Sequence, residues 1–384
     1  MSRNGRMRDQ RFLVAGKGVN IHQERRDTMS LSMPDQRMAW RGADLRKDDI
    51  AFDLTRRHAA ALEELLGRFR KQGLGLGEIL PEHCRHPALD ADLARVFDEI
   101  QEGRGIVIIR GIPVAGYSDD DVSAMFWALG AHFGRGVSQS ARGDLLGLVR
   151  DETPPGEPES ARGYTSRREL SLHVDLAQIV GLMCVRQARS GGASQYASGL
   201  AAYEEIRAKR PDLLPTLRRG FPYHRRGEEA PGQPLITPYD IPVFSEREGR
   251  VSIFMVREII NAAYRELKRT FTPEEIEAID TFRATARDLQ FETRLEPGEA
   301  SFLNNYTIMH ARSEFDDWDD PRKNRLMLRL WLDVERHARP VVPTIHIYEN
   351  EGGRSGIDPQ PGRLPAVASY RTPDELVRQP AAVK

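Results

Sequence analysis

Three residues combine the side-chain types and spacing of a small metal site. His173 and Asp175 stand two positions apart in ELSLHVDLA, and His310 follows in NNYTIMHARSEF. On an extended strand, positions i and i+2 point to the same side, so the imidazole and the carboxylate would converge from one rigid element. Two neutral imidazoles and one carboxylate are typical of a facial iron(II) site with coordination positions open to small molecules. The spacing His-x-Asp alone is weak, because it is common by chance.

A second pattern lies on the strand predicted over residues 325–333, RLMLRLWLD. One face carries Leu326, Leu328, Leu330 and Leu332, and the other carries Arg325, Met327, Arg329, Trp331 and Asp333. The leucine face is expected to pack on a core. Arginines among apolar groups need anionic partners if they are buried, and a bound dicarboxylate could supply one through bidentate pairing. The alternative is that both arginines lie on the solvent side of an edge strand.

Composition excludes several classes of protein. The chain has 384 residues, with 56 Lys and Arg against 57 Asp and Glu, so its formal net charge is −1. This balance argues against a strongly basic nucleic-acid binder. No run of eighteen apolar residues indicates a membrane span, and no secretory signal is visible. Cys84 and Cys184 cannot build a disulfide framework, which favours the cytoplasm.

The elements that must position these residues are short strands separated by long excursions. Strands are expected over 105–110, 178–186, 251–256, 300–306 and 325–333, and helices over 54–72, 118–130, 199–209 and 272–288. This pattern favours a jelly roll decorated by helices. We expect a poorly ordered N-terminal segment (1–48), a single domain (49–350) with lid insertions at about 136–168 and 222–245, and a C-terminal tail (351–384).

Taken together, the motifs resemble the taurine dioxygenase-like (TauD/TfdA) family of Fe(II)- and 2-oxoglutarate-dependent dioxygenases. The resemblance runs from about 103 to 335, and its motifs occur in the order LSLHVDLA, SGGASQYASGLAAYEEI, NNYTIMHARSEF and NRLMLRLWL. It implies a mainly β fold with helices, the double-stranded β-helix. It also implies Fe(II) held by His173, Asp175 and His310, with 2-oxoglutarate as cosubstrate and O2 as oxidant.

The resemblance further implies the reaction. An unactivated C–H bond of a small carboxylate- or amine-bearing substrate would be oxidised, by hydroxylation, with release of succinate and CO2. Asp175 argues against halogenation, because related halogenases carry a small residue there. Desaturation and cyclisation stay open.

The cosubstrate residues are also carried over from the resemblance. Arg325, fifteen residues beyond His310, resembles the arginine that binds the distal carboxylate of 2-oxoglutarate, and Ser194 stands where a hydroxyl helps to hold it. Arg329 resembles the arginine that faces the substrate. The insert DDWDDPRK lengthens the usual spacing, so the roles of Arg325 and Arg329 could be exchanged.

Candidate substrate residues flank the metal motif. They are Glu169, Arg162, Tyr164, Asn304, Asn305 and Arg329. A carboxylate for Arg329 and an amine for Glu169 would make the substrate an amino acid or a derivative. The pattern expected for taurine recognition is not found. The alternatives are a surface glutamate, a solvated loop arginine, and asparagines that serve a turn.

Two other functions use the same three ligands. One is a non-catalytic barrel that senses a metal and a dicarboxylate, and the other is a zinc hydrolase, which gives no role to Arg325 or Ser194. A nucleic-acid demethylase of the same superfamily is disfavoured by the neutral charge. Relatives often form dimers or tetramers, which favours a homo-oligomer.

Overall fold

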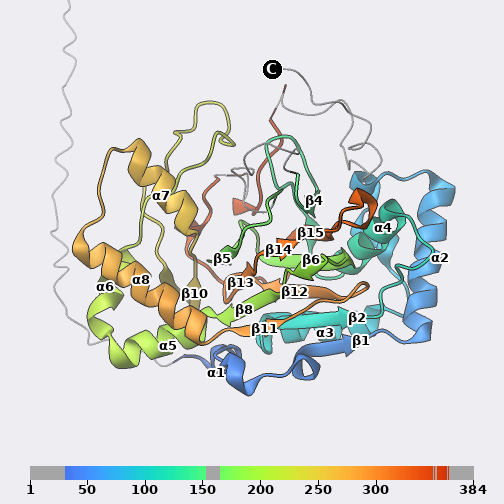
Figure 1. Ribbon diagram of the computed structural model, residues 1–384, viewed down its shortest axis with the longest axis horizontal. Coiled ribbons are helices and arrows are strands. Elements are labelled where there is room, and N and C mark those ends of the chain that lie inside the picture. Colours follow the sequence, from blue (N-terminus) through green and yellow to red (C-terminus); the bar gives the residue numbers. More distant parts are fainter. Residues whose placement is uncertain (1–30, 153–164, 349, 351–352, 361, 363–384) are drawn as a thin grey trace, which may run out of the picture. The chain divides into compact units, whose positions relative to one another are not determined.

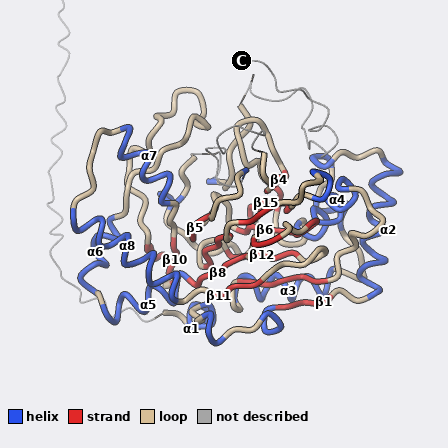
Figure 2. Tube along the Cα trace, viewed as in Figure 1, coloured by secondary structure: helices blue, strands red, loops and turns tan. Residues whose placement is uncertain are grey.

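The computed structural model describes residues 31–152 and 165–348, together with residues 350, 353–360 and 362. Within these residues, the strands gather at the centre and helices lie on both sides of them (Figure 1, Figure 2). Two facing sheets make up most of the strand content, and the site predicted from the sequence lies between them.

The larger sheet has seven strands among the described residues. Its order is β1 (Ala51–Asp53), β2 (Ile106–Arg110), β12 (Ala300–Asn304), β6 (Ile179–Arg186), β15 (Leu326–Asp333) and β3 (Arg135–Gly136), with β4 (Leu146–Val149) also paired to β15. All pairs are antiparallel except β1 with β2. Because β15 has neighbours on both sides, Arg329 does not lie on an edge strand; Arg325 immediately precedes β15.

The smaller sheet runs in the order β11 (Phe291–Thr293), β8 (Ser194–Ser198), β13 (Ile308–Arg312) and β5 (Leu170–His173). Along the chain, β5, β8 and β13 belong to this sheet, whereas β6, β12 and β15 belong to the larger one. This alternation between two facing sheets is the predicted double-stranded β-helix. Two short pairs lie beside it: β9 (Phe244–Arg247) with β10 (Arg250–Ile253), and β7 (Ser190–Gly191) with β14 (Phe315–Asp316).

Helices cover the outside of each sheet. The larger sheet is flanked by α2 (Arg56–Gln72), α3 (Asp90–Glu102) and α4 (Asp119–Gly130), and the smaller by α5 (Gly199–Lys209) and α8 (Pro273–Asp288) (Figure 1). Helix α6 (Leu214–Arg219) packs on α8, and α7 (Arg257–Glu266) borders the cavity described below. Short 3-10 helices span Gly42–Asp44, Lys47–Ile50, Leu76–Glu78, Pro81–Cys84, Pro211–Leu213, Pro321–Lys323 and Pro343–Ile345. A capping box begins α8: the Thr272 Oγ1 accepts a hydrogen bond from the Glu275 backbone N–H, and the Glu275 carboxylate accepts one from the Thr272 N–H.

The side chains on the two faces of β15 pack in different surroundings, as their alternation along the strand predicts. Leu326, Leu328, Leu330 and Leu332 are buried in the cluster that the helices α2 to α4 share with the larger sheet. Met327 points the other way, into a smaller cluster between the sheets that contains Tyr196 and Ile308. Apolar side chains therefore fill part of the barrel interior, and the remainder holds the polar side chains described below.

The folded unit begins earlier than residue 49. Helix α1 (Met33–Met38) and Trp40 are packed on the core, and the Trp40 indole donates to the carbonyl of Arg104. Asp35 is fully buried and pairs with Arg250 and Arg339, at 2.8 and 2.7 Å. The expected boundary was wrong for residues 31–48 because a six-residue helix carries too little apolar periodicity to be recognised.

Parts of both expected lid insertions are bound to the rest of the fold. Residues 146–149 form β4, so the first insertion contributes to the larger sheet, and residues 153–164 lie outside the described part. In the second, the buried side chain of Arg225 donates to the carbonyls of Ile347 and Pro234. The Tyr348 hydroxyl donates to the Arg225 carbonyl, so this loop and the segment 345–348 hold each other.

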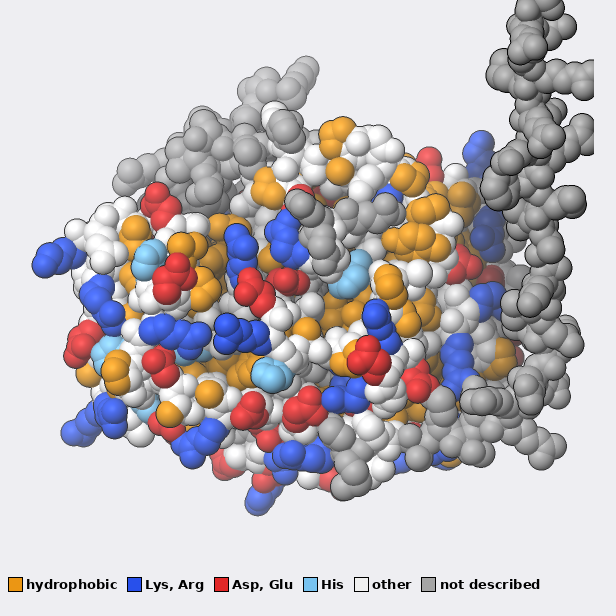
Figure 3. Space-filling model, turned by 180° about the vertical axis from the view of Figure 1, so that it is seen from behind, with side chains coloured by type: hydrophobic (Ala, Val, Ile, Leu, Met, Phe, Trp, Pro, Cys, Tyr) orange, Lys and Arg blue, Asp and Glu red, His pale blue; other side chains and the backbone are white. Residues whose placement is uncertain are grey.

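The surface agrees with the neutral composition. Basic and acidic side chains are intermixed over the face shown in Figure 3. In the part of the chain that the structure describes, we find no helix that is long and apolar enough to span a membrane.

Candidate active site

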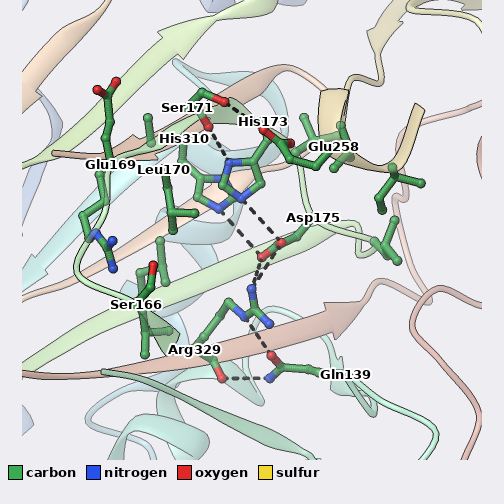
Figure 4. Close-up of a pocket in the computed structure, with 18 of the residues that line it drawn as sticks. Gln139, Ser166, Glu169, Leu170, Ser171, His173, Asp175, Glu258, His310 and Arg329 are labelled. Atoms are coloured by element: carbon green, nitrogen blue, oxygen red, sulfur yellow. Dashed lines mark hydrogen bonds and ion pairs between the residues drawn. The ribbon is translucent and has the colours of Figure 1, made fainter. Parts of the chain in front are cut away.

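The three predicted metal ligands meet between the two sheets. His173 ends β5 and His310 lies on β13, where the two residues are direct register partners with ring centroids 4.4 Å apart. The Asp175 carboxylate lies 3.9 Å from Nε2 of His173 and 3.7 Å from Nε2 of His310 (Figure 4). One ligand atom from each residue lies within 4.8 Å of the others, which is close enough for a single ion.

Asp175 is not on the strand that carries His173. The chain leaves the sheet after His173, because the next backbone N–H, that of Val174, donates to the carbonyl of Met255. The expectation of one extended strand through both residues was therefore wrong, although both side chains reach the same point. Asn305 fixes the turn: its amide donates to the carbonyl of Asp175, at 2.6 Å, and accepts from the Asp175 N–H, at 3.0 Å.

The larger sheet orients the Asp175 carboxylate. The Trp331 indole N–H donates to Oδ2 at 2.9 Å, and Nη1 of Arg329 lies 3.3 Å from both carboxylate oxygens. Burial alone would favour the neutral acid, but Arg329 and the two histidines outweigh it and lower the pKa of Asp175 below its usual value. The carboxylate is therefore held ionised, which is the form that binds a metal.

Both histidines are also held as neutral imidazoles, which is the form that binds a metal. Nδ1 of His173 lies 2.8 Å from the carbonyl of Ser171, so an N–H placed there leaves the Nε2 lone pair facing Asp175. Burial lowers the pKa of His310 to about 3, which keeps its imidazole neutral. Nδ1 of His310 is buried and has no hydrogen-bond partner among the described residues. This donor set, with two neutral imidazoles and one carboxylate, fits Fe(II).

A cavity of about 1000 Å³ opens onto the three ligands. This volume is at the upper end of the range for small-molecule sites, and it leaves room for more than one bound molecule. The predicted residues that line it are Arg325, Arg329, Ser194 and Glu169, in addition to the three ligands. The structure therefore brings together residues from β5, β8, β13 and β15.

Arg325 is a buried cation without an acidic partner. Its side chain is 3% exposed, and burial lowers its pKa to about 10. Its guanidinium stacks over the Phe315 ring, and Nη1 lies 3.3 Å from the carbonyl of Val149. No carboxylate of a described residue lies within ion-pair distance of it. Because a buried charge needs compensation, this arginine is suited to bind an anion that enters the cavity.

Arg329 has a different environment, four residues further along the chain and within β15. In addition to Asp175, its Nε donates to the Gln139 side chain at 2.8 Å, and the Gln139 amide donates back to the Arg329 carbonyl at 2.9 Å (Figure 4). Arg329 is thus already paired with the metal-binding carboxylate of Asp175, whereas Arg325 has no such partner among the described residues.

The remaining predicted substrate residues fall into three groups. Glu169 is exposed, lines the cavity, and stands at the edge of the cluster in Figure 4. Asn304 and Asn305 are fully buried and do not line the cavity, so we correct their assignment: Asn305 positions Asp175, and Asn304 serves the turn after β12. Arg162 and Tyr164 lie outside the described residues.

Several lining residues were not among the predicted ones. Glu258 and Ile259 belong to α7, a helix that was not predicted, and the Ser171 hydroxyl donates to Glu258 at 3.3 Å. Tyr348 comes from the segment that holds the second insertion. An amphipathic period over 257–266 could have revealed α7, but nothing local links either segment to the metal motif.

Comparisons with known proteins agree with this geometry. A family profile described as "Taurine catabolism dioxygenase TauD, TfdA family" matches residues 80–331, a range that contains the three ligands and both arginines. The chain is 28% identical over 284 residues to FR-33289 synthase of Streptomyces rubellomurinus, covering 72% of this chain and 83% of that protein. It is 27% identical over 306 residues to taurine hydroxylase-like protein SAT17 of Stachybotrys chartarum, covering 76% and 78%.

Solved structures show the same fold. Asparagine oxygenase, in complex with Fe(II), 2S,3S-3-hydroxyasparagine and succinate, matches with a TM-score of 0.57 at 18% identity, over 74% of this chain and 93% of that chain. The non-heme iron oxygenase OrfP, in complex with Fe and alpha-ketoglutaric acid, matches with a TM-score of 0.55 at 13% identity, over 73% and 93%. At these identities the likeness concerns the fold alone.

Proposed function

Because the chain belongs to the TauD, TfdA family of dioxygenases, we propose that it hydroxylates an unactivated C–H bond of a small substrate that bears a carboxylate or an amine. Family membership makes it a 2-oxoglutarate-dependent oxidoreductase that uses Fe(II) and O2, and it argues against the sensor and the zinc hydrolase. The observation that carries the proposal is the convergence of His173, Asp175 and His310 beside a buried arginine, Arg325, that has no acidic partner among the residues the structure describes.

The metal would be held by His173, Asp175 and His310. When bound, Fe(II) with 2-oxoglutarate and O2 supplies the oxidising power for C–H hydroxylation, and 2-oxoglutarate leaves as succinate and CO2. The protein fixes the ligand geometry: the Ser171 carbonyl selects the tautomer of His173, and Trp331 fixes the rotation of the Asp175 carboxylate. Such supporting bonds commonly change metal affinity by about 10- to 100-fold.

We assign the distal carboxylate of 2-oxoglutarate to Arg325 and the Ser194 hydroxyl. Both side chains are buried and line the cavity, from the larger and the smaller sheet respectively. An arginine fork pairs with a carboxylate through two parallel hydrogen bonds, and here it would do so in a water-poor setting. Arg329, held by Asp175 and Gln139, is assigned to orienting the metal-binding carboxylate beside the substrate.

The substrate would enter between the smaller sheet and α7. Glu169 and Glu258 line this side, and either carboxylate could pair with a substrate amine. Apolar side chains there, such as Ile259 and Leu176, would contact the carbon skeleton and exclude water. The pairing of Glu169 with an amine stays a prediction.

The first experiment is to add Fe(II) and 2-oxoglutarate to the anaerobic protein and record the visible metal-to-ligand charge-transfer band, with His310→Ala as the control. We expect a band for the natural protein and none for the variant. If the natural protein binds iron but gives no band, 2-oxoglutarate does not chelate the metal and the proposal fails.

Two further proposals concern the cellular setting and the assembly of the protein. Both cysteines are buried and unpaired, which supports a reducing compartment, and we propose the cytoplasm. A homo-oligomer stays a prediction from the family.

A further inference from the structure

The turn that carries Asp175 is held in part by a segment near the end of the described chain. This turn lies between β5 and β6, where the carbonyls of Asp175 and Ala177 accept hydrogen bonds from the Asn305 amide, at 2.6 and 2.7 Å. The carbonyl between them, that of Leu176, accepts from the backbone N–H of Gly356, at 2.9 Å. Asn305 and Gly356 together therefore bind three successive carbonyls, the first of which belongs to a metal ligand.

Gly356 lies outside the barrel in sequence. The family profile ends at residue 331, and β15, the last strand among the described residues, ends at Asp333. The neighbouring Ser355 joins this later segment to the end of β15, because its N–H and its hydroxyl both donate to the Asp333 carboxylate, at 2.9 and 2.6 Å. The segment is thus held between the end of one barrel strand and the turn that carries Asp175.

The same segment also binds the loop that supports Arg329. The N–H groups of Ile357 and Gln360 donate to the carbonyls at positions 138 and 141, at 2.9 and 2.8 Å. Between these two positions lies Gln139, whose side chain accepts from the Arg329 guanidinium that pairs with Asp175 (Figure 4). The segment therefore contacts the surroundings of the Asp175 carboxylate from two directions.

The structure accepts only glycine at position 356. Its φ is +86°, in the left-handed region that other residues rarely adopt. A Cβ at this position would lie 2.7 Å from Cγ2 of Val137 and 2.9 Å from the carbonyl oxygen of Ser138, so one of the groups would have to move. Gly353, in the same segment, has a φ of +70°, yet a Cβ there would meet no atom within 4 Å. Gly353 therefore provides a matched comparison, with a similar backbone conformation and no close contact.

We propose that residues 353–360 are a brace for the metal site, and that Gly356 is a positioning residue that fixes the Asp175 turn through Leu176. Because Asp175 lies in the loop between β5 and β6, no strand ladder fixes its backbone, and the turn depends on such bonds. The brace contacts no metal ligand side chain and acts through the backbone. The inference rests on the proposed function for the identity of the metal, whereas the bracing of the turn does not depend on it.

The test compares Gly356→Ala with Gly353→Ala by two measurements. The first is amide hydrogen exchange of the metal-free proteins, in peptides that cover residues 174–178. The second is anaerobic titration with Fe(II) in the presence of 2-oxoglutarate, with the visible charge-transfer band as readout. For Gly356→Ala we expect faster exchange of the turn and an Fe(II) affinity about tenfold lower. For Gly353→Ala we expect the values of the natural protein in both measurements.

Ser355→Ala keeps the inference testable if Gly356→Ala does not fold. It removes the hydroxyl bond to Asp333 without adding a contact, and we expect both changes in the same direction and to a smaller degree. Natural values in every variant that folds, or equal changes in Gly356→Ala and Gly353→Ala, would overturn the inference. If no protein gives the charge-transfer band while exchange of the turn still depends on Gly356, the brace stands and the oxygenase assignment fails.

Discussion

At the scale of single residues, Arg325, just before β15, and Arg329, on β15, make separable predictions. Arg325→Gln is expected to weaken 2-oxoglutarate binding about 10- to 100-fold and to leave Fe(II) affinity unchanged, because its guanidinium would bind the cosubstrate and its protein contacts are Phe315 and Val149 rather than the metal ligands. Arg329→Gln is expected to weaken Fe(II) binding, because Asp175 loses its cation. Titration of each ligand, with the visible band as readout, checks both. The reverse pattern would show that the two roles are exchanged.

We predict that Trp331 positions the Asp175 carboxylate. Trp331→Phe removes the N–H that Asp175 accepts but keeps an aromatic ring, so Fe(II) affinity should fall about tenfold. The matched control is Trp127→Phe, which removes a buried 2.9 Å bond to the Ile79 carbonyl in the cluster that the helices α2 to α4 share with the larger sheet. The control should lose stability without losing metal affinity. Equal metal affinity in both variants would remove the role from Trp331.

The ligand residues could be predicted because their chemistry is carried by residue type and short spacing. The side chains that hold these ligands in place could not be predicted. Asn305 was expected to contact substrate, yet its amide forms a hydrogen bond with the backbone of Asp175, 130 positions away in the sequence. Nothing in the neighbourhood of an asparagine tells which distant backbone it will meet. The same holds for Gln139, which reaches Arg329 across 190 positions.

At the scale of elements, the start of α4 predicts how the stability of the protein depends on pH. The Asp121 carboxylate accepts from the Ser118 N–H at the start of this helix and pairs with Arg70. Burial would raise its pKa, but Ser118 and Arg70 outweigh burial and lower it. The folded pKa thus lies below the unfolded value of about 3.9, so the stabilisation is present above that pH and is lost as pH falls through the folded pKa.

Asp121→Asn should therefore lower the free energy of unfolding by about 1 kcal/mol at pH 7. The difference should shrink once pH falls below about 4. Urea unfolding of both proteins across this range measures it. A difference that is constant with pH would mean that the carboxylate charge does not matter and that only the shape of the cap does.

Elements with strong local signals were predictable, and those defined by tertiary contacts were not. The α8 helix carries its own capping box and was expected over nearly the same residues. By contrast, β5 ends at His173 only because Val174 finds the Met255 carbonyl, and β4 forms only because β15 offers an edge. Both depend on partners more than 80 positions away, which no local pattern encodes.

At the scale of the whole molecule, residues near both ends of the folded unit meet at Asp35. Asp35→Ala should destabilise the protein by about 3–5 kcal/mol, because Arg339 would be left buried without a carboxylate. Asp320→Ala, which breaks an exposed pair with Arg322, is the control and should have far less effect. Chemical denaturation compares the two. Similar losses of unfolding free energy in the two variants would show that the buried pair contributes no more to stability than the exposed one.

The register of β13 against β5 has a consequence for how this chain can change in length. His310 faces His173, and a register shift between His310 and Arg312 already accommodates one extra residue in β5. Without such a bulge, one residue added inside either strand would send an imidazole to the opposite face. Apart from Asp316, which ends β14, the residues DDWDDPRK lie between β14 and β15, and they lengthen the interval to Arg325 without moving it from the cavity. A change of length inside these two strands therefore has to be absorbed by a bulge, whereas a change of length in that loop does not alter the pairing of the two histidines.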